Sequence, residues 1–436
     1  MATSEPGPPR REVTVPLLRR VEGEGGLRLG FSDGALSEVA LEIFEPPRYF
    51  EAFLVGRGAL EAPDITARIC GICPVAYQTS SSLALEAIAG ATLTPEIAAL
   101  RRLLYCGEWL QSHALHVFLL HAPDFFGCTD AVELAQRDRG LVERGLRLKR
   151  AGNQLLETIG GRAIHPVNVR AGGFYRAPAS AAVAALVPVL RDALEDARAA
   201  AEWAATLHYP DLHRDYRLVA LRGAGAYPIE SGAYVAGPDG LAVSPAEFAE
   251  LAVEHHVAHS TALQARLGGE AYLTGPLARF AHNRDLLPPL AAAAADAAGL
   301  GAICTNPYRS LLVRCVELVA ACEEALRLAE AYVPPDPPAV SLRLGQGRGF
   351  GASEAPRGLL LIGYATDAEG DLTWARITPP TSQNQLSIEG DLRVLAEGGA
   401  SLSDGELAQR CEAAVRNHDP CISCSAHFLD LEVTRR

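Results

Sequence analysis

The sequence predicts an α+β protein that is predominantly helical, with a central long four-helix bundle and small antiparallel β elements. Between residues 94 and 333, four long segments carry apolar side chains at helical spacing. Near the N-terminus and again around residues 357–378, apolar and polar residues alternate between turn residues, which is typical of antiparallel strands. A length of 436 residues allows a large core around such a bundle.

The N-terminal region starts with a leader rich in proline and charge, residues 1–11, which we expect to be disordered. In residues 13–44, Val, Leu and Ile alternate with polar residues, and the glycines of residues 23–26 and 33–34 supply turns. We therefore expect antiparallel strands here, followed by a short helix at residues 48–58.

The helical core is predicted from four amphipathic or Ala-rich segments, at residues 94–121, 129–159, 177–207 and 285–333. The first begins with Thr94 and Pro95, a start signal in which the proline fits the first turn. The last is expected to be interrupted near Pro307, and the Pro-rich residues 334–338 end it.

The C-terminal region is predicted to contain a hairpin at residues 357–378 whose turn is at residues 367–370. A loop at residues 379–384 and a helical stretch at residues 391–416 are expected to follow. Residues 345–349 are rich in glycine but lack a full dinucleotide-binding pattern, so we interpret them as a loop.

We expect one domain behind the leader, made of an N-terminal β region, a helical core, a C-terminal α+β region and a short tail. The expected boundaries are 1–11 for the leader, 12–436 for the domain, and 12–45, 94–333, 339–427 and 428–436 for its parts.

Composition and charge exclude several classes of partner. The formal net charge of −13 argues against nucleic acid or an anionic membrane surface. No uninterrupted apolar stretch is long enough to span a membrane, and the N-terminus lacks the apolar region of a secretory signal. Ten cysteines without a disulfide pattern fit a reducing compartment, so we expect a cytoplasmic protein.

Two Cys-x-x-Cys pairs stand near opposite ends of the chain: Cys70 with Cys73, and Cys421 with Cys424. Two residues between cysteines let both thiolates reach one metal ion, and four sulfurs make a soft tetrathiolate site. Cys73 and Cys421 are 348 positions apart, whereas the pairs of a zinc ribbon lie roughly 15–20 residues apart. A structural zinc site and a redox disulfide pair remain alternatives at this point.

The flanking residues carry a family resemblance. Arg68-Ile-Cys-Gly-Ile-Cys73 and Asp419-Pro-Cys-Ile-Ser-Cys-Ser-Ala-His427 resemble the paired signatures of the large, catalytic subunit of nickel-iron hydrogenases. Residues 72–78, 110–116 and 161–168 look like the cytoplasmic, bidirectional branch, especially its sulfhydrogenase or NADP-linked type. The resemblance extends from about Val15 to His427. One departure is Tyr77, where many hydrogenases have His.

The resemblance implies the metals and their ligands. All four cysteines would hold nickel, and Cys73 and Cys424 would also bind an iron that carries carbon monoxide and cyanide. Glu51 and His427 would bind a magnesium ion near the C-terminus, although a histidine ligand is unusual for magnesium.

The resemblance also implies catalytic residues. Heterolytic cleavage of H2 needs a base for the proton, and a terminal thiolate, Cys421, would serve first. Glu22 matches the carboxylate that relays the proton, and the alternative is that it only occupies a turn. Arg357 matches an arginine above the metals, and Asp419 would hold it as a charge-assisted pair. For these two residues, a surface arginine and a turn-forming aspartate are the alternatives.

Partners follow from what this chain lacks. It has no further cysteine cluster and no dinucleotide fingerprint, so electrons would leave through a small iron-sulfur subunit. A further iron-sulfur subunit and a flavin diaphorase subunit would then reduce NAD(P). Maturation chaperones and an endopeptidase that acts on the tail are also implied.

Three other functions are alternatives to an active hydrogenase. Relatives in the quinone-site subunit of respiratory complex I have lost the four cysteines, which this chain retains. A hydrogen-sensing regulatory subunit would keep the same metal site. A zinc-stabilised interaction protein would use the cysteines structurally. His113, His116, His165 and Arg68 are further candidates for contacts around the site or the partner.

Overall fold

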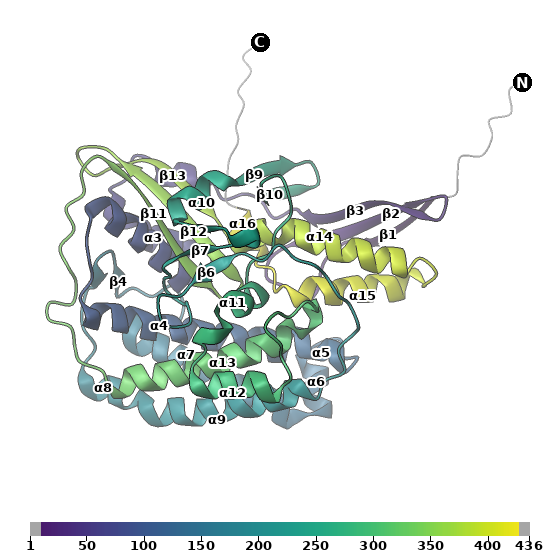
Figure 1. Cartoon of the computed structure of the whole chain (residues 1–436), viewed down its shortest axis with the longest axis horizontal. Coiled ribbons are helices and arrows are strands. Elements are labelled where there is room, and N and C mark those ends of the chain that lie inside the picture. The colour runs from purple at the N-terminus through teal and green to yellow at the C-terminus, as the bar shows by residue number, and fades with distance from the viewer. Residues whose placement is uncertain (1–9, 427–436) are drawn as a thin grey trace, which may run out of the picture.

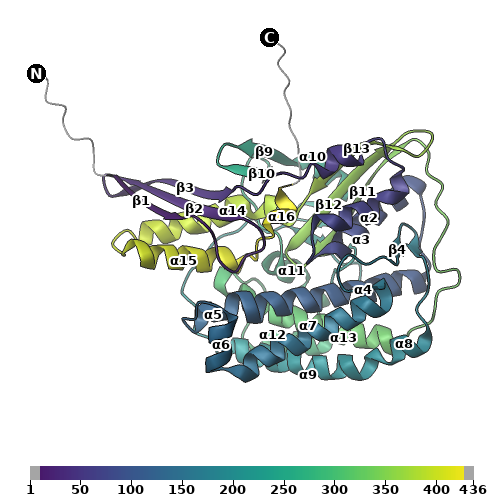
Figure 2. The ribbon, with the colours of Figure 1, turned by 180° about the vertical axis from the view of Figure 1, so that it is seen from behind.

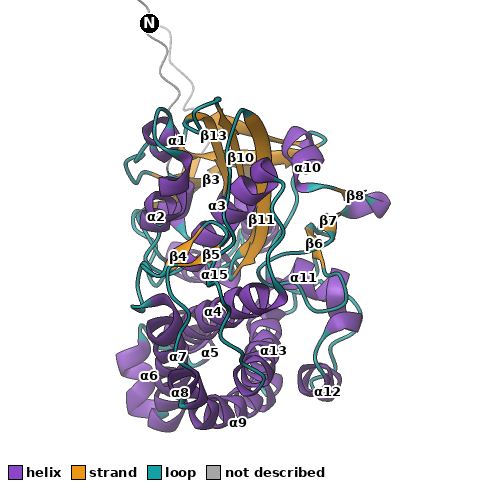
Figure 3. Cartoon of the chain, turned by 90° about the vertical axis from the view of Figure 1, so that its left-hand side faces the viewer, coloured by secondary structure: helices purple, strands orange, loops and turns teal. Residues whose placement is uncertain are grey.

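A layer of long helices lies beneath small antiparallel sheets in this computed structural model, which describes residues 10–426 (Figure 1). The bundle consists of α4 (Pro95–Ala114), α7 (Arg139–Gly160), α9 (Leu186–Ala205) and α13 (Ser310–Glu330). Figure 3 shows these helices gathered together below the strands. The prediction of an α+β fold around a four-helix bundle is therefore confirmed.

Three strands and two helices form a unit beside the main body, as Figure 2 shows from behind. β1 (Arg10–Val15), β2 (Gly25–Ser32) and β3 (Ala35–Ile43) pair antiparallel in that order. Their buried side chains share a small core with α14 (Pro380–Gly398) and α15 (Asp404–Asn417). The N-terminal strands thus pack against the helices that lead into the second cysteine pair.

The central sheet has the order β11 (Gly347–Ala355), β12 (Gly358–Thr366) and β13 (Leu372–Thr378). Its second hairpin is the predicted one, but β11 was predicted to begin as a loop. A glycine of that predicted loop, Gly349, instead allows the strand to touch α3 (Pro74–Ala89), since a Cβ there would lie 2.4 Å from the carbonyl oxygen of Ala84.

Three helix boundaries differ from prediction. The loop predicted at residues 379–384 is the first turn of α14, because Pro380 occupies the first helical position, where a proline costs no hydrogen bond. The helical stretch predicted at residues 391–416 is divided between α14 and α15, and Ser403 caps the second helix with a capping box. Residues 129–159 likewise form two helices, because Asp138 caps a new one.

The remaining elements connect these layers. Short helices and turns surround the first cysteine pair and the bundle: α1 (Phe50–Leu54), α2 (Ala62–Thr66), the π-helical segment Leu115–His121, α5 (Ala122–Phe125), α6 (Ala131–Arg137), α8 (Ser180–Ala184), α10 (Pro245–Leu251), α11 (Pro276–Asn283), α12 (Pro289–Ala297) and α16 (Ile422–Ser425). Small antiparallel strands complete the fold: β4 (Val169–Arg170), β5 (Gly173–Phe174), β6 (Ala220–Arg222), β7 (Tyr234–Ala236), β8 (Ala242–Val243), β9 (Ala252–Val257) and β10 (Ser260–Leu267). Within residues 10–426, no helix combines the length and apolar character needed to cross a membrane.

Candidate metal centre

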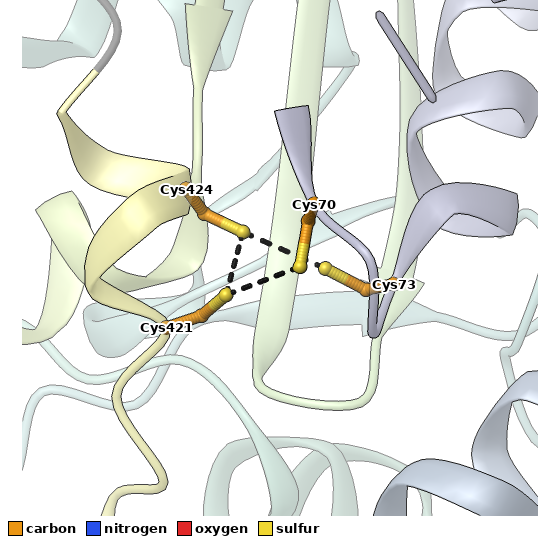
Figure 4. A group of neighbouring side chains, drawn as sticks. All are labelled: Cys70, Cys73, Cys421 and Cys424. Atoms are coloured by element: carbon orange, nitrogen blue, oxygen red, sulfur yellow. Dashed lines mark hydrogen bonds between the residues drawn. The ribbon is translucent and has the colours of Figure 1, made fainter. Parts of the chain in front are cut away.

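The fold brings both cysteine pairs together (Figure 4). The four sulfur atoms all lie within 4.8 Å of one another, and all four residues are buried. The Sγ atoms of Cys70 and Cys421 are 3.4 Å apart, and those of Cys73 and Cys424 are 3.6 Å apart. The arrangement can bind metal through soft donors from both ends of the chain.

Helix starts and a backbone bridge position the cysteines. Cys73 is the residue before α3 and Cys421 the residue before α16, so both stand at the start of a helix. The backbone of Glu22 pairs with Cys421 as an isolated β-bridge, and the amide of Ile422 donates to the Glu22 carbonyl at 2.9 Å. The N-terminal turn therefore fixes the second pair directly.

The protonation chemistry of the cluster fits a bound cation. Hydrogen bonds from the three neighbouring thiols hold the pKa of Cys70 well below its ordinary value. Burial raises the pKa of Cys421 and of Cys424. The cluster therefore favours one thiolate by itself, and further deprotonation requires a positive charge among the sulfurs, as metal binding supplies.

Glu22 reaches the cluster with its side chain. Its Oε2 accepts from Cys421 Sγ at 3.0 Å and from the Ser423 amide at 3.1 Å. Burial and the charge of Cys70 raise its pKa, against the hydrogen bonds from Ser423 and Cys421. Gly23, at φ 88°, allows this close approach, because a Cβ there would lie 2.7 Å from that of Ile422.

Arg357 and Asp419 form a buried pair over the same site. Arg357 Nε donates to the Asp419 carbonyl at 2.8 Å, and its NH2 group donates to Asp419 Oδ1 at 3.1 Å. Among residues 10–426, Arg357 NH1 and Asp419 Oδ2 have no hydrogen-bond partner although both atoms are buried. Charges of Asp419 and of three cluster cysteines oppose the effect of burial and raise the pKa of Arg357. The guanidinium therefore keeps one free donor in the neighbourhood of the sulfurs.

The residues expected to bind magnesium are described in part. Glu51 Oε1 accepts from the Ile377 amide at 2.6 Å, and burial raises the pKa of Glu51 to about 8. His427 lies outside the described residues. The preceding residue, Ala426, accepts a hydrogen bond from the Arg48 amide at 3.1 Å, so residue 426 and the start of α1 lie close together.

The other candidates do not all reach the cluster. His113 and His116 are fully buried in the bundle, where His113 Nε2 lies 3.0 Å from Glu317. Arg68 is exposed and pairs with the carboxylate of Asp64 at 3.1 Å. His165 is partly exposed, with φ 50°. The six single cysteines are all buried: Cys106, Cys128, Cys304, Cys315, Cys322 and Cys411.

Two residues that support the cluster were not predicted. Glu108 on α4 is fully buried and accepts from the amides of Val75 and Ala76 at 2.6 and 3.0 Å, so it caps the helix that follows Cys73. Thr381 accepts from the Cys421 amide at 2.9 Å. Glu108 is the only charged residue in the apolar stretch 103–110, which was a signal, whereas Thr381 gave none.

Comparison with known proteins assigns this geometry to a family. A profile described as nickel-dependent hydrogenase matches residues 48–143. The chain is 33% identical to the sulfhydrogenase 1 subunit alpha of Pyrococcus furiosus, over 96% of this chain and 98% of that protein. This chain belongs to the nickel-dependent hydrogenase family. It is the large, catalytic subunit of a nickel-iron hydrogenase, an oxidoreductase that acts on H2.

Further relatives agree with this assignment. The chain is 25% identical to the NAD-reducing hydrogenase HoxS subunit beta of Cupriavidus necator, over 96% of this chain and 95% of that protein. A crystal structure of an NAD+-reducing [NiFe]-hydrogenase in the H2-reduced state superposes with a TM-score of 0.86 and 27% identity, covering 96% of this chain and 99% of that one. A [NiFeSe]-hydrogenase of Dm. baculatum, at 18% identity, shares the fold with a TM-score of 0.77 over 96% of this chain and all of that one.

Proposed function

We propose that this hydrogenase subunit cleaves H2 heterolytically at the four-cysteine cluster, with Glu22 as proton acceptor and Arg357 as an electrostatic positioning group. The observation that carries the proposal is the joint geometry of the cluster, since Glu22 hydrogen-bonds to Cys421 and the Arg357 guanidinium, with one free donor, is charge-coupled to the same cysteines. A structural zinc site needs neither group.

Nickel and an iron with carbon monoxide and cyanide fit the donor set. Four buried sulfurs from two loops would hold the nickel, and Cys73 and Cys424 would also bind the iron. When bound, this centre would supply the redox chemistry of H2 cleavage.

The proton leaves through the protein's own groups. A proton on Cys421 Sγ is within hydrogen-bond reach of Glu22 Oε2, at 3.0 Å. Thiol and carboxylate are thus already paired, so the transfer needs no movement of the backbone. Glu24, the adjacent carboxylate, is exposed and takes no part.

The Arg357 guanidinium is fixed on one edge and free on the other. Asp419 occupies Nε and NH2, which leaves NH1 as a donor for a ligand of the centre, such as cyanide. A charge held in a dry site before the reaction starts needs no reorganisation later. Asp419 is therefore assigned to holding Arg357 in position.

A magnesium ion is assigned to Glu51 together with His427. Support comes from the closeness of Ala426, the last residue that the structure describes, to Arg48 just before α1. Magnesium binding would also neutralise a carboxylate whose pKa is raised by burial.

Electrons are proposed to pass to a small iron-sulfur subunit, and then through a further iron-sulfur subunit and a flavin subunit to NAD(P) in the cytoplasm. The NAD-reducing relatives support this acceptor. An exposed apolar patch made of Ile164, Val167 and Tyr175 offers a docking surface, and Ile164 is adjacent to Gly71 in the first cysteine loop. Chaperones and an endopeptidase would complete the centre.

Infrared spectroscopy of the complex from its native host tests the proposal. We expect one carbonyl band and two cyanide bands that shift under H2. A folded protein with zinc and no such bands would make the cysteines structural. Slow turnover in a complex with these bands would instead indicate a hydrogen sensor.

A further inference from the structure

Helix α14 holds both ends of residues 418–421, the segment that contains Asp419. At the N-terminal end of this helix, Thr381 Oγ1 accepts from the Cys421 amide at 2.9 Å. Ten residues later, about 15 Å along the helix axis, Asp391 accepts from His418 Nε2 at 2.8 Å. Asp419 lies between these two attachments, so one rigid element fixes residues 418–421.

Asp391 is the centre of a buried polar cluster that the proposed mechanism does not use. It is fully buried, and three side chains approach its carboxylate. Arg214 Nε donates to Oδ1 at 2.8 Å, and the Tyr216 hydroxyl donates to Oδ2 at 2.6 Å. Gly390 leaves room for this arrangement, because a Cβ there would lie 2.6 Å from Arg214 NH2. A buried carboxylate with this many charged and polar partners is held in one orientation.

The segment that Asp391 fixes has an unusual backbone. Asp419 has φ 51°, in the left-handed region that a non-glycine residue adopts only when its surroundings enforce it. Its carbonyl and its carboxylate both bind Arg357, so a rotation of this residue would displace both acceptors at once. The position of the guanidinium therefore depends on what anchors His418.

We propose that Asp391, acting through His418, is a positioning residue that keeps Asp419 and Arg357 aligned over the cluster. This inference rests on the role of Arg357 in the proposed function. Neither Asp391 nor His418 contacts the sulfurs, so their effect is expected on the rate of the reaction and not on retention of the metal.

The same helix offers a matched control. Glu389 Oε1 accepts from His259 Nε2 at 2.8 Å, the same length as the bond between Asp391 and His418. Glu389 also accepts from the Leu41 amide, so it joins α14 to the N-terminal sheet and not to the Asp419 segment. Glu389→Gln therefore removes the charge of an equivalent carboxylate, two residues away, without affecting the proposed path.

The test compares variants of the complete enzyme from its native host. Asp391→Asn places an amide NH2 opposite a donor of His418, and His418→Ala removes the side chain. Both are expected to lower kcat for H2 oxidation about tenfold or more with unchanged metal content, while KM for H2 stays within about twofold. His418→Gln, whose amide nitrogen can replace Nε2, should restore most of the rate, and Glu389→Gln should resemble the parent.

A double-mutant cycle separates this role from a general loss of structure. In an Arg357→Lys background, Asp391→Asn and His418→Ala should cause little further loss, because the group on which they act is already absent. Hydrogen exchange of the metal-free full chain should be faster near residues 416–422 in both variants and unchanged in Glu389→Gln. Unfolding temperatures that stay near the parent value would exclude a global effect.

Three outcomes would overturn the inference: parental kcat in Asp391→Asn and His418→Ala, additive losses in the Arg357→Lys background, or losses that only follow metal content. If Asp391→Asn does not fold, His418→Ala and His418→Gln decide alone. Parental turnover in Arg357→Lys itself would refute the proposed function and this inference together, whereas a slow Arg357→Lys with fast Asp391 and His418 variants would refute only the inference.

Discussion

Two buried arginines, Arg279 and Arg357, occupy neighbouring regions and differ in how completely they are bonded. Arg279 donates five hydrogen bonds, three of them to Glu317 and Glu354. The other two go to the carbonyls of Ala355 and Pro356, directly before Arg357. Arg357 uses only part of its guanidinium, because NH1 has no partner within the described part of the chain.

We propose that this difference distinguishes a supporting arginine, Arg279, from one that acts in the reaction, Arg357. Arg279 also lies over the ring of Trp109, at 4.6 Å from its centroid, so both its edge and its face are occupied. A fully bonded buried ion leaves nothing for a ligand, whereas an unpaired donor beside a metal site is available to one. Arg279, held by Glu317 and Glu354, thus fixes the turn from which Arg357 extends. Four predictions test this division between the two arginines.

The largest expected effect is a loss of stability in Arg279→Leu. This substitution would leave Glu317 and Glu354 buried without their cation and lower the free energy of unfolding by about 3–5 kcal/mol. Chemical denaturation of the metal-free chain measures this loss. A change below about 1 kcal/mol would mean that the carboxylates find other partners or take up protons.

Glu22→Gln should leave the metals in place and slow both turnover and H/D exchange by about 10²–10⁴-fold, because the amide cannot accept the proton. Metal analysis and gas-phase exchange measure the two effects separately. Glu24→Gln, next to it but exposed, is the control and should behave like the parent. Unchanged exchange in Glu22→Gln would disprove the relay.

Arg357→Lys should lower turnover by about 10²–10³-fold while metal content and unfolding temperature stay close to those of the parent. Lysine keeps the charge but cannot reproduce two fixed bonds to Asp419 and a free donor. Arg279→Lys is the comparison, and there stability should fall more than rate. Near-normal H2 oxidation by Arg357→Lys would contradict the division.

The smallest expected effect is a dependence of folding stability on pH. Burial lowers the pKa of His113 to about 4, against the opposing influence of Glu317. In the unfolded chain His113 therefore binds a proton below about pH 6.5, whereas in the folded chain it does so only below about pH 4. Stability should fall as the pH falls, by about 2 kcal/mol between pH 6.5 and pH 5. Denaturation of His113→Gln over that range should show a weaker dependence, and equal slopes would refute the assignment.

The sequence predicted what depends on local pattern. Helical spacing identified the bundle, and the cysteine spacing identified the four cysteines that the fold brings together. The pattern misled at Gly349, where the missing side chain lets a strand touch α3, and at Pro380, which starts α14. Supporting residues such as Thr381 and Asp391 could not be predicted, because their importance lies in partners about 40 and 27 positions away.

The pairing of Cys70 with Cys421 spans 351 positions, so the ribosome synthesises the two halves of the cluster at well-separated times. A ribosome adding roughly 5–20 residues per second needs on the order of 20–70 s between the two ends of the cluster. Throughout that interval the first pair has no counterpart, so a prematurely terminated chain has only half of the ligand set. A metal site made of all four cysteines can therefore assemble only on a chain whose translation has passed Cys424.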